Sequence, residues 1–281
     1  MSQYDENESE TERQRYLPRM TWIVGAASTL GYAVGLSDVC VTFKSGTTRD
    51  CVQKLYPISR FFAVGFAGSV AIGFLMLDAL DQWLGPTPEG VAWIPDELAE
   101  RFPAVARHVF TKAPESERVL NSHLMLLAAH PTEDFGIPGY AKCSVHIFRS
   151  PDFIPTPSLP GKVVSIGSGS VVERYKDLLA GFSSNPLSLL RGEEMGHKRG
   201  SVALELAITN MVMKQPAHGV SAHLHVCTVR RGEIELRPNN YDTYPPSGEK
   251  IEFRMPPVAH SLRAFLDMTR ANGWDAECAT C

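Results

Sequence analysis

Two long runs without a charged residue, 20–37 and 61–77, dominate the first third of the chain. Uncharged runs of this length occur in membrane-spanning helices and in strands that are buried on both faces of a sheet. Gly, Ser and Thr interrupt both runs, and the middle of the first has the composition of a tight turn. We therefore favour buried strands of a layered globular fold, and a membrane-anchored protein is the less favoured alternative.

The overall composition is that of a globular protein. Of 281 residues, 44% are apolar and 21% are charged, which excludes wholesale disorder. The 27 basic and 31 acidic residues give a net charge of −4, which argues against a nucleic-acid partner. The 6 cysteines are too sparse for a disulfide scaffold and fit a reducing compartment, so we expect a cytoplasmic protein. No pattern indicates a cofactor, and His223 and His225 lack an evident third partner for a metal site.

The composition divides the chain into three parts. Residues 1–20 form a polar leader or propeptide, or lie upstream of the true start, because they hold too few apolar side chains to order themselves. Residues 21–238 form the main domain. Residues 239–281 are expected to be an irregular extension with a short helix at 261–272.

The order of expected elements identifies the fold class as α+β. Strands, pairs of helices and again strands follow one another, without the strict alternation of a doubly wound parallel sheet. The order suits two antiparallel sheets packed face to face with helices outside. The elements are strands at 21–27, 32–42, 51–57, 60–66, 121–130, 142–149, 162–166, 221–229 and 232–237, and helices at 68–84, 96–110, 171–181 and 200–214.

Five local features are candidates for chemistry. Thr21 begins the first strand, Asp38 ends the second, and Lys54 lies in the third. Two glycine-serine turns, at 67–69 and 167–169, each precede a helix. Such turns present free backbone N–H groups that can bind an anion or an oxyanion. Each feature alone is common and usually structural.

Taken together and in this order, the five features resemble the proteasome family of N-terminal nucleophile (Ntn) hydrolases, which includes proteasome β-subunits and the HslV-type bacterial peptidases. The resemblance covers about residues 21–237. Lys54 follows Asp38 by sixteen residues and Gly68 follows Lys54 by fourteen, as in that family. Thr21 to Asp38 is one residue longer, and the 28–31 turn absorbs the difference.

The resemblance implies a four-layer αββα sandwich and a threonine-type peptidase without a cofactor. It implies peptide or unfolded-protein substrates and a homo-oligomeric ring or spiral, with an ATPase partner left open. The catalytic residues that it implies are Thr21 as nucleophile, Asp38, Lys54, Gly68 as oxyanion donor and Ser168 as partner of the Thr21 amine. The substrate-binding residues are Thr42, Phe66 and Ala67.

The chemistry of these residue types fits that assignment. A Thr hydroxyl is a weak nucleophile and needs a base, and a free α-amine with a reference pKa of about 7.7–8.0 can serve as one. Lys54 would stabilise negative charge on the Thr21 hydroxyl oxygen, and Asp38 would orient Lys54.

Two departures from the family pattern leave alternatives open. The family usually carries an Asp just after the last helix, whereas 215–218 contains no acid; Gln215 or His218 would have to substitute, or the site is impaired. Met20 stands where a Gly usually precedes the nucleophile, so Thr21 would be exposed either by self-cleavage or by translation from Met20 followed by removal of that methionine. A catalytically inactive structural or binding subunit is therefore the alternative function.

Overall fold

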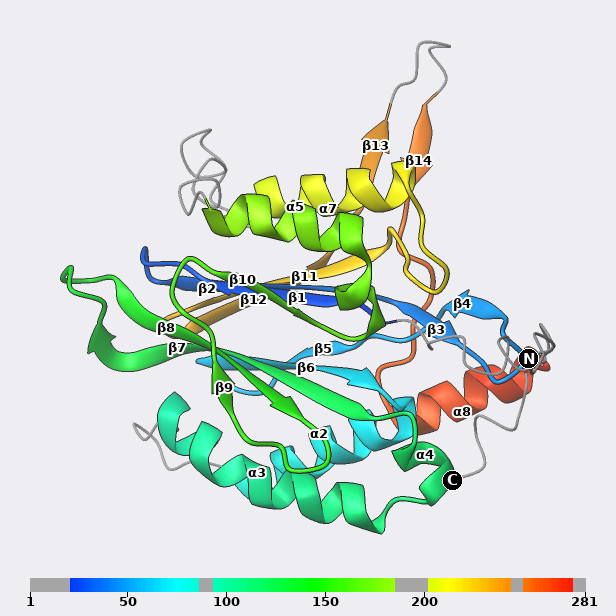
Figure 1. Ribbon diagram of the computed structural model, residues 1–281, viewed down its shortest axis with the longest axis horizontal. Coiled ribbons are helices and arrows are strands. Elements are labelled where there is room, and N and C mark those ends of the chain that lie inside the picture. Colours follow the sequence, from blue (N-terminus) through cyan, green and yellow to red (C-terminus); the bar gives the residue numbers. More distant parts are fainter. Residues whose placement is uncertain (1–20, 86–92, 185–201, 244–249, 275–281) are drawn as a thin grey trace, which may run out of the picture.

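The computed structural model of the protein describes residues 21–85, 93–184, 202–243 and 250–274 (Figure 1). The leader expected at 1–20 lies outside the described residues. Two five-stranded antiparallel sheets form the centre of the molecule. The first has the order β10 (Val163–Ile166), β1 (Ile23–Ala27), β2 (Tyr32–Asp38), β11 (Leu224–Arg230), β12 (Glu233–Pro238). The second has the order β5 (Leu55–Pro57), β6 (Phe62–Gly68), β7 (Ser122–Asp134), β8 (Ala141–Arg149), β9 (Thr156–Pro157).

Two small sheets and the helices complete the described chain. The small antiparallel sheets are β3 (Cys40–Thr42) with β4 (Thr48–Asp50), and β13 (Tyr241–Thr243) with β14 (Ile251–Phe253). The helices are α2 (Val70–Leu84), α3 (Pro95–Lys112), α4 (Glu115–Arg118), the 3₁₀ helix η1 (Ser168–Val171), α5 (Glu173–Ser184), α7 (Val202–Lys214) and α8 (Leu262–Ala271).

The two large sheets face each other, and helices cover their outer faces (Figure 1). Helices α5 and α7 lie over the first sheet, where Leu179, Ile208 and Val34 belong to one cluster of buried apolar side chains. Helices α2 and α3 lie over the second sheet in a cluster of apolar side chains that includes Phe74 and Phe102. A third cluster joins residues of β1 and β2 to residues of β5, β6 and β7, and it fills the space between the sheets.

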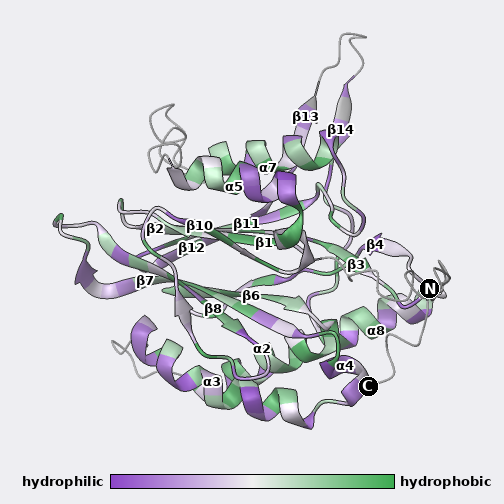
Figure 2. Cartoon of the chain, viewed as in Figure 1, coloured by the Kyte–Doolittle hydropathy of each residue, from purple (hydrophilic) through white to green (hydrophobic). Residues whose placement is uncertain are grey.

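Hydrophobic patterning explains this arrangement. Every residue of β1 and β2 is buried, because β1 and β2 contact the other sheet on one face and helices on the opposite face. Figure 2 shows hydrophobic residues along most of α2, and hydrophilic and hydrophobic residues alternating along α3. The pattern of α3 is that of a helix with one buried and one solvated face. The described chain is therefore an α+β protein with antiparallel sheets.

The sequence placed most elements within a few residues of their observed bounds, and three differences stand out. The expected strand at 32–42 is two strands, since β2 ends at Asp38 and β3 leaves the large sheet to pair with β4. The short strand β4 itself had not been expected.

None of the helices within the described ranges has both the length and the apolar content needed to cross a membrane.

The third difference is the region beyond Asn239, which we expected to be irregular apart from a short helix at 261–272. That helix is observed as α8, and the region also forms the β13–β14 pair and a parallel bridge between Ala259 and Val52. Phe265 of α8 is buried in the same apolar cluster as α2 and α3. The end of the described chain therefore packs onto the main domain next to the segment that carries Lys54.

Candidate active site

Thr21 lies just before β1 and is fixed through its backbone. Its nitrogen donates a hydrogen bond to the Ser168 hydroxyl oxygen at 3.2 Å, and its carbonyl oxygen accepts one from the Gly169 N–H at 3.2 Å. Ser168 and Gly169 belong to η1, which follows β10 directly, and β10 is the neighbour of β1. The sheet register therefore brings the second glycine-serine turn to Thr21, next to the residue that the resemblance implied as its partner.

Lys54 extends from the second sheet to the first. It immediately precedes β5, and its Nζ donates hydrogen bonds to Thr21 Oγ1 at 3.2 Å, to Asp38 Oδ1 at 2.9 Å and to the carbonyl oxygen of Cys40. An ammonium group has three donors, and all three are used here. The Lys54 side chain is only 1% exposed, so these contacts hold its charge in one place beside the Thr21 hydroxyl.

Asp38 is the counter-ion of Lys54 and is completely buried. Its Oδ1 also accepts the Trp22 N–H at 3.0 Å, and its Oδ2 accepts the Ser221 N–H at 3.4 Å. Burial raises the pKa of the Asp38 carboxyl above its ordinary value, while the charge of Lys54 and these N–H donors counteract the rise. A buried pair of this kind needs both partners, because removing one leaves an uncompensated charge in the interior.

Gly68 ends β6 at the turn into α2. Its φ is +104°, a conformation that glycine adopts without strain and that other residues rarely adopt. Ser69, the next residue, caps α2 by accepting the Ile72 N–H at 3.1 Å, and its own hydroxyl donates to Glu117 Oε2 at 2.5 Å. These contacts hold the turn that carries the expected oxyanion donor.

Substituting Gly68 by Ala is expected to destabilise the fold and to impair the site. The added Cβ would lie 2.2 Å from the Asn121 carbonyl oxygen, a backbone atom that cannot move aside alone. The strained φ costs about 1–3 kcal/mol, and the overlap adds about 1–3 kcal/mol. Chemical denaturation measures the loss. Gly46→Ala is the matched control, because Gly46 has a φ of +83° and no neighbouring atom within 4 Å. Equal losses of unfolding free energy in the two variants would mean that the overlap with the Asn121 carbonyl oxygen adds nothing to the strain at Gly68.

Gly167 shows how close the two glycine turns come to Thr21. Its φ is +84°, and a Cβ there would lie 2.1 Å from the Thr21 carbonyl oxygen and 3.3 Å from the Ala67 Cβ. Ala67 directly precedes Gly68. The structure therefore brings Thr21, Asp38, Lys54, Ser168 and the Ala67–Gly68 step of β6 into one region, which lies where the ends of the two sheets meet.

Comparison with known proteins adds no family to this geometry. No family model matches the chain, and no curated protein matches it. Any functional assignment therefore depends on the arrangement of the side chains.

The three residues expected to bind substrate differ in their positions. Ala67 lies beside Gly167 and Thr21. Thr42 is buried in β3, opposite Thr48 of β4. The Phe66 side chain points to the other side of β6, where it packs against Tyr56 and Phe74 in the core under α2. Successive residues of a strand face opposite sides, so a role for the Phe66 side chain in binding substrate is wrong.

The loop after α7 does not supply the missing acid through the residues suggested from the sequence. The side chains of Gln215 and His218 are both exposed. The residue of this loop that reaches the site is Ser221, through its N–H to Asp38. Ser221 in turn contacts Asp50 and His223, two residues that the sequence did not assign to the site. The closeness of Asp50 to Lys54 in the chain was the one available signal.

The histidines near this region form no metal site, because the described part of the chain contains no group of three or more His, Cys, Asp and Glu side chains able to hold a metal ion. His223 Nδ1 lies 2.7 Å from Asp50 Oδ2, and burial lowers the pKa of His225 to about 4.

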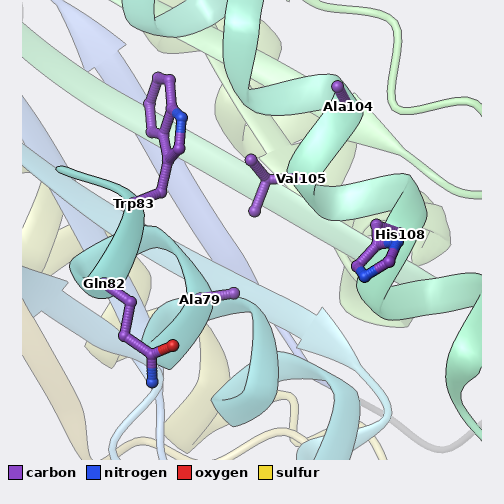
Figure 3. A pocket seen from close by; sticks show the side chains of 6 residues that line it. All are labelled: Ala79, Gln82, Trp83, Ala104, Val105 and His108. Atoms are coloured by element: carbon purple, nitrogen blue, oxygen red, sulfur yellow. The ribbon is translucent and has the colours of Figure 1, made fainter.

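An open pocket of about 550 Å³ lies between α2 and α3, away from this region (Figure 3). It contains none of the candidate active-site residues, and its lining is Ala79, Gln82, Trp83, Ala104, Val105 and His108.

Proposed function

We propose that the protein is a threonine-type peptidase or amide hydrolase of the N-terminal nucleophile class, with Thr21 as the nucleophile once residues 1–20 are absent. The observation that carries this proposal is the buried Lys54 ammonium, which contacts both Thr21 Oγ1 at 3.2 Å and Asp38 Oδ1 at 2.9 Å. The same proposal interprets the two facing sheets and their outer helices as the four-layer αββα sandwich of this class.

The mechanism follows from the positions of these groups. In a chain that begins at Thr21, the Thr21 nitrogen, which is hydrogen-bonded to Ser168, is a free α-amine. It accepts the proton of the Thr21 hydroxyl. The hydroxyl oxygen attacks the substrate carbonyl carbon, and the Gly68 N–H stabilises the resulting oxyanion. The amide C–N bond breaks, the amine product takes the proton, and Thr21 is left as an acyl ester. Water then attacks the ester, releasing the acid and restoring the hydroxyl.

The alternative of a catalytically inactive subunit is less well supported. A buried Lys–Asp pair seldom stabilises a fold more than apolar residues of similar size would. Placing that lysine on a Thr hydroxyl at the start of a strand therefore suits catalysis better than structure. The absence of an acid in 215–218 and the presence of Met20 before Thr21 are the observations that favour the alternative.

Two measurements on the wild-type protein test the proposed function. Intact-mass spectrometry is expected to find a chain that begins at Thr21. A peptide epoxyketone, which reacts with a hydroxyl and the adjacent free amine together, is expected to label that residue. An unprocessed chain that no such electrophile labels, and that hydrolyses no member of a peptide-amide panel, would support the inactive subunit instead.

We also propose that the active form is a homo-oligomer. Leu206 and Met213 lie seven residues apart on α7 and are 60% and 53% exposed, so one face of this helix offers apolar area to a second copy. Sedimentation at micromolar concentration measures the assembly. A monomer of 30.9 kDa or less that still hydrolyses peptides would contradict it.

A further inference from the structure

The region beyond Asn239 makes a direct contact with the loop that reaches the candidate site. The ring of Phe253, in β14, stacks on the His223 ring with centroids 4.3 Å apart and planes 14° apart. Phe253 also stacks on Tyr241 of β13 at 4.7 Å. The hydroxyl of Tyr241 contacts the sulfur of Met213, which places the β13–β14 pair beside the end of α7 (Figure 1).

One carboxylate oxygen of Asp50 ties this loop to the segment that carries Lys54. Asp50 Oδ2 accepts the Ser221 hydroxyl at 2.6 Å and lies 2.7 Å from His223 Nδ1. The backbone N–H of His223 donates to the same Ser221 oxygen at 2.9 Å. The Ser221 hydroxyl is thus a donor on one side and an acceptor on the other, which leaves it a single orientation.

The electrostatics of Asp50 agree with this geometry. Partial burial alone would raise the pKa of its carboxyl, but the hydrogen bonds from His223 and Ser221 lower the pKa below its ordinary value. Asp50 is therefore ionised at neutral pH, and hydrogen bonds to an ionised acceptor are stronger than those between neutral groups.

The other side of Ser221 faces the buried ion pair. Its backbone N–H donates to Asp38 Oδ2 at 3.4 Å, while Oδ1 of the same carboxylate binds Lys54. A distance of 3.4 Å is near the limit at which a hydrogen bond persists. A movement of the loop by a few tenths of an ångström would therefore break this contact and free one side of Asp38.

We propose that Asp50, His223 and Phe253 are positioning residues, which hold the Ser221 N–H against Asp38 and so let the β13–β14 pair set the alignment of Lys54 toward Thr21. The effect on catalysis rests on the proposed function, whereas the effect on the loop does not. None of the three side chains touches the reacting atoms in this mechanism.

A second set of hydrogen bonds holds the same loop and does not involve Asp50. Asn239 accepts the Leu224 N–H at 2.8 Å and donates to the Ala222 carbonyl oxygen at 2.8 Å. Loss of the Asp50 or Phe253 side chain therefore leaves the loop attached and disturbs the residues on either side of Ala222. An ordinary exposed ion pair would contribute only about 0–1 kcal/mol and would have no effect on the ion pair of the site.

Hydrogen exchange and steady-state kinetics on the full chain test the proposal with four variants. Asp50→Asn and Phe253→Ala remove parts of the network. Phe253→Tyr keeps the stacking ring and is the conservative rescue. Glu252→Ala, the neighbouring position on β14, removes only contacts with exposed Lys250 and Arg254 and is the matched control.

In Asp50→Asn and Phe253→Ala, exchange of the Ser221 and His223 amides is expected to rise about tenfold or more, because the network no longer holds these two N–H groups on their acceptors. With a peptide substrate, kcat should fall about 10–100-fold and KM should change less than about twofold, because misplacement of a catalytic group slows the chemical step. Phe253→Tyr and Glu252→Ala should match the wild type in both measurements.

The two readouts separate the two proposals. If the wild type hydrolyses nothing, the proposed function fails, and the exchange measurement alone decides whether the network positions the loop. Unchanged exchange in Asp50→Asn and Phe253→Ala would overturn the inference. Faster exchange with unchanged kcat in an active enzyme would overturn it as well.

Discussion

Replacement of Thr21 by Ala is expected to lower peptide hydrolysis by about 10⁴-fold or more and to abolish labelling by a peptide epoxyketone, because the attacking oxygen is gone. The fold should persist, since Thr21 is held by its backbone contacts with Ser168 and Gly169, which the substitution retains. Lys54 would lose one of its three acceptors, at a cost of about 1–3 kcal/mol in the free energy of unfolding.

Two further substitutions at this position separate the hydroxyl from the shape of the side chain. Thr21→Val keeps the branched shape and removes the hydroxyl, so it should be as inactive as Thr21→Ala. Thr21→Ser keeps the hydroxyl and should retain turnover and labelling. Turnover of Thr21→Val at the wild-type rate would remove Thr21 from the mechanism.

Replacement of Lys54 is the second large effect. Lys54→Ala is expected to reduce kcat by several orders of magnitude, because it removes the cation beside the Thr21 hydroxyl. It should also lower the free energy of unfolding by about 3–5 kcal/mol, since Asp38 is left buried without its partner. Lys54→Arg should fail as well, because a planar guanidinium cannot reach the three acceptors of a compact ammonium.

A double substitution separates the catalytic loss from the structural loss. Lys54→Met combined with Asp38→Asn removes both charges and keeps the side-chain volumes close to those of the wild type. Replacing a buried ion pair by neutral groups is often harmless to stability, so the free energy of unfolding should recover relative to Lys54→Ala. Hydrolysis should stay absent. Recovery of activity together with stability would mean that Lys54 is only a structural charge.

Local signals in the sequence were sufficient for the elements and for part of the site. The buried strands and the helices follow from apolar runs and from glycine-serine turns, which act over a few residues. Asp38 and Gly68 stand out locally because each ends an expected strand, whereas the grouping of these two residues with Lys54 into one site was implied by the resemblance to the Ntn hydrolases. The contact of Lys54 with Thr21 and Asp38 agrees with that prediction.

The side of the sheet to which a single side chain points was harder to predict. Phe66 and Ala67 are adjacent and both apolar, and only the packing of β6 between α2 and the first sheet shows that Ala67 faces Gly167 while Phe66 faces the helix. A one-residue difference in strand register reverses such an assignment, and the sequence contains no marker of register in a strand that is buried on both sides.

The sequence by itself determined the strand and helix segments and the α+β class, because these depend on local hydrophobicity and turn chemistry. Only the tertiary structure revealed the contacts of Asp50 with Ser221 and His223, which are 171 and 173 residues away along the chain. It likewise decided that the residues beyond Asn239 pack beside the site. Contacts at such separation arise from the pairing of β11 with β2, and no short-range pattern encodes which distant strands become neighbours.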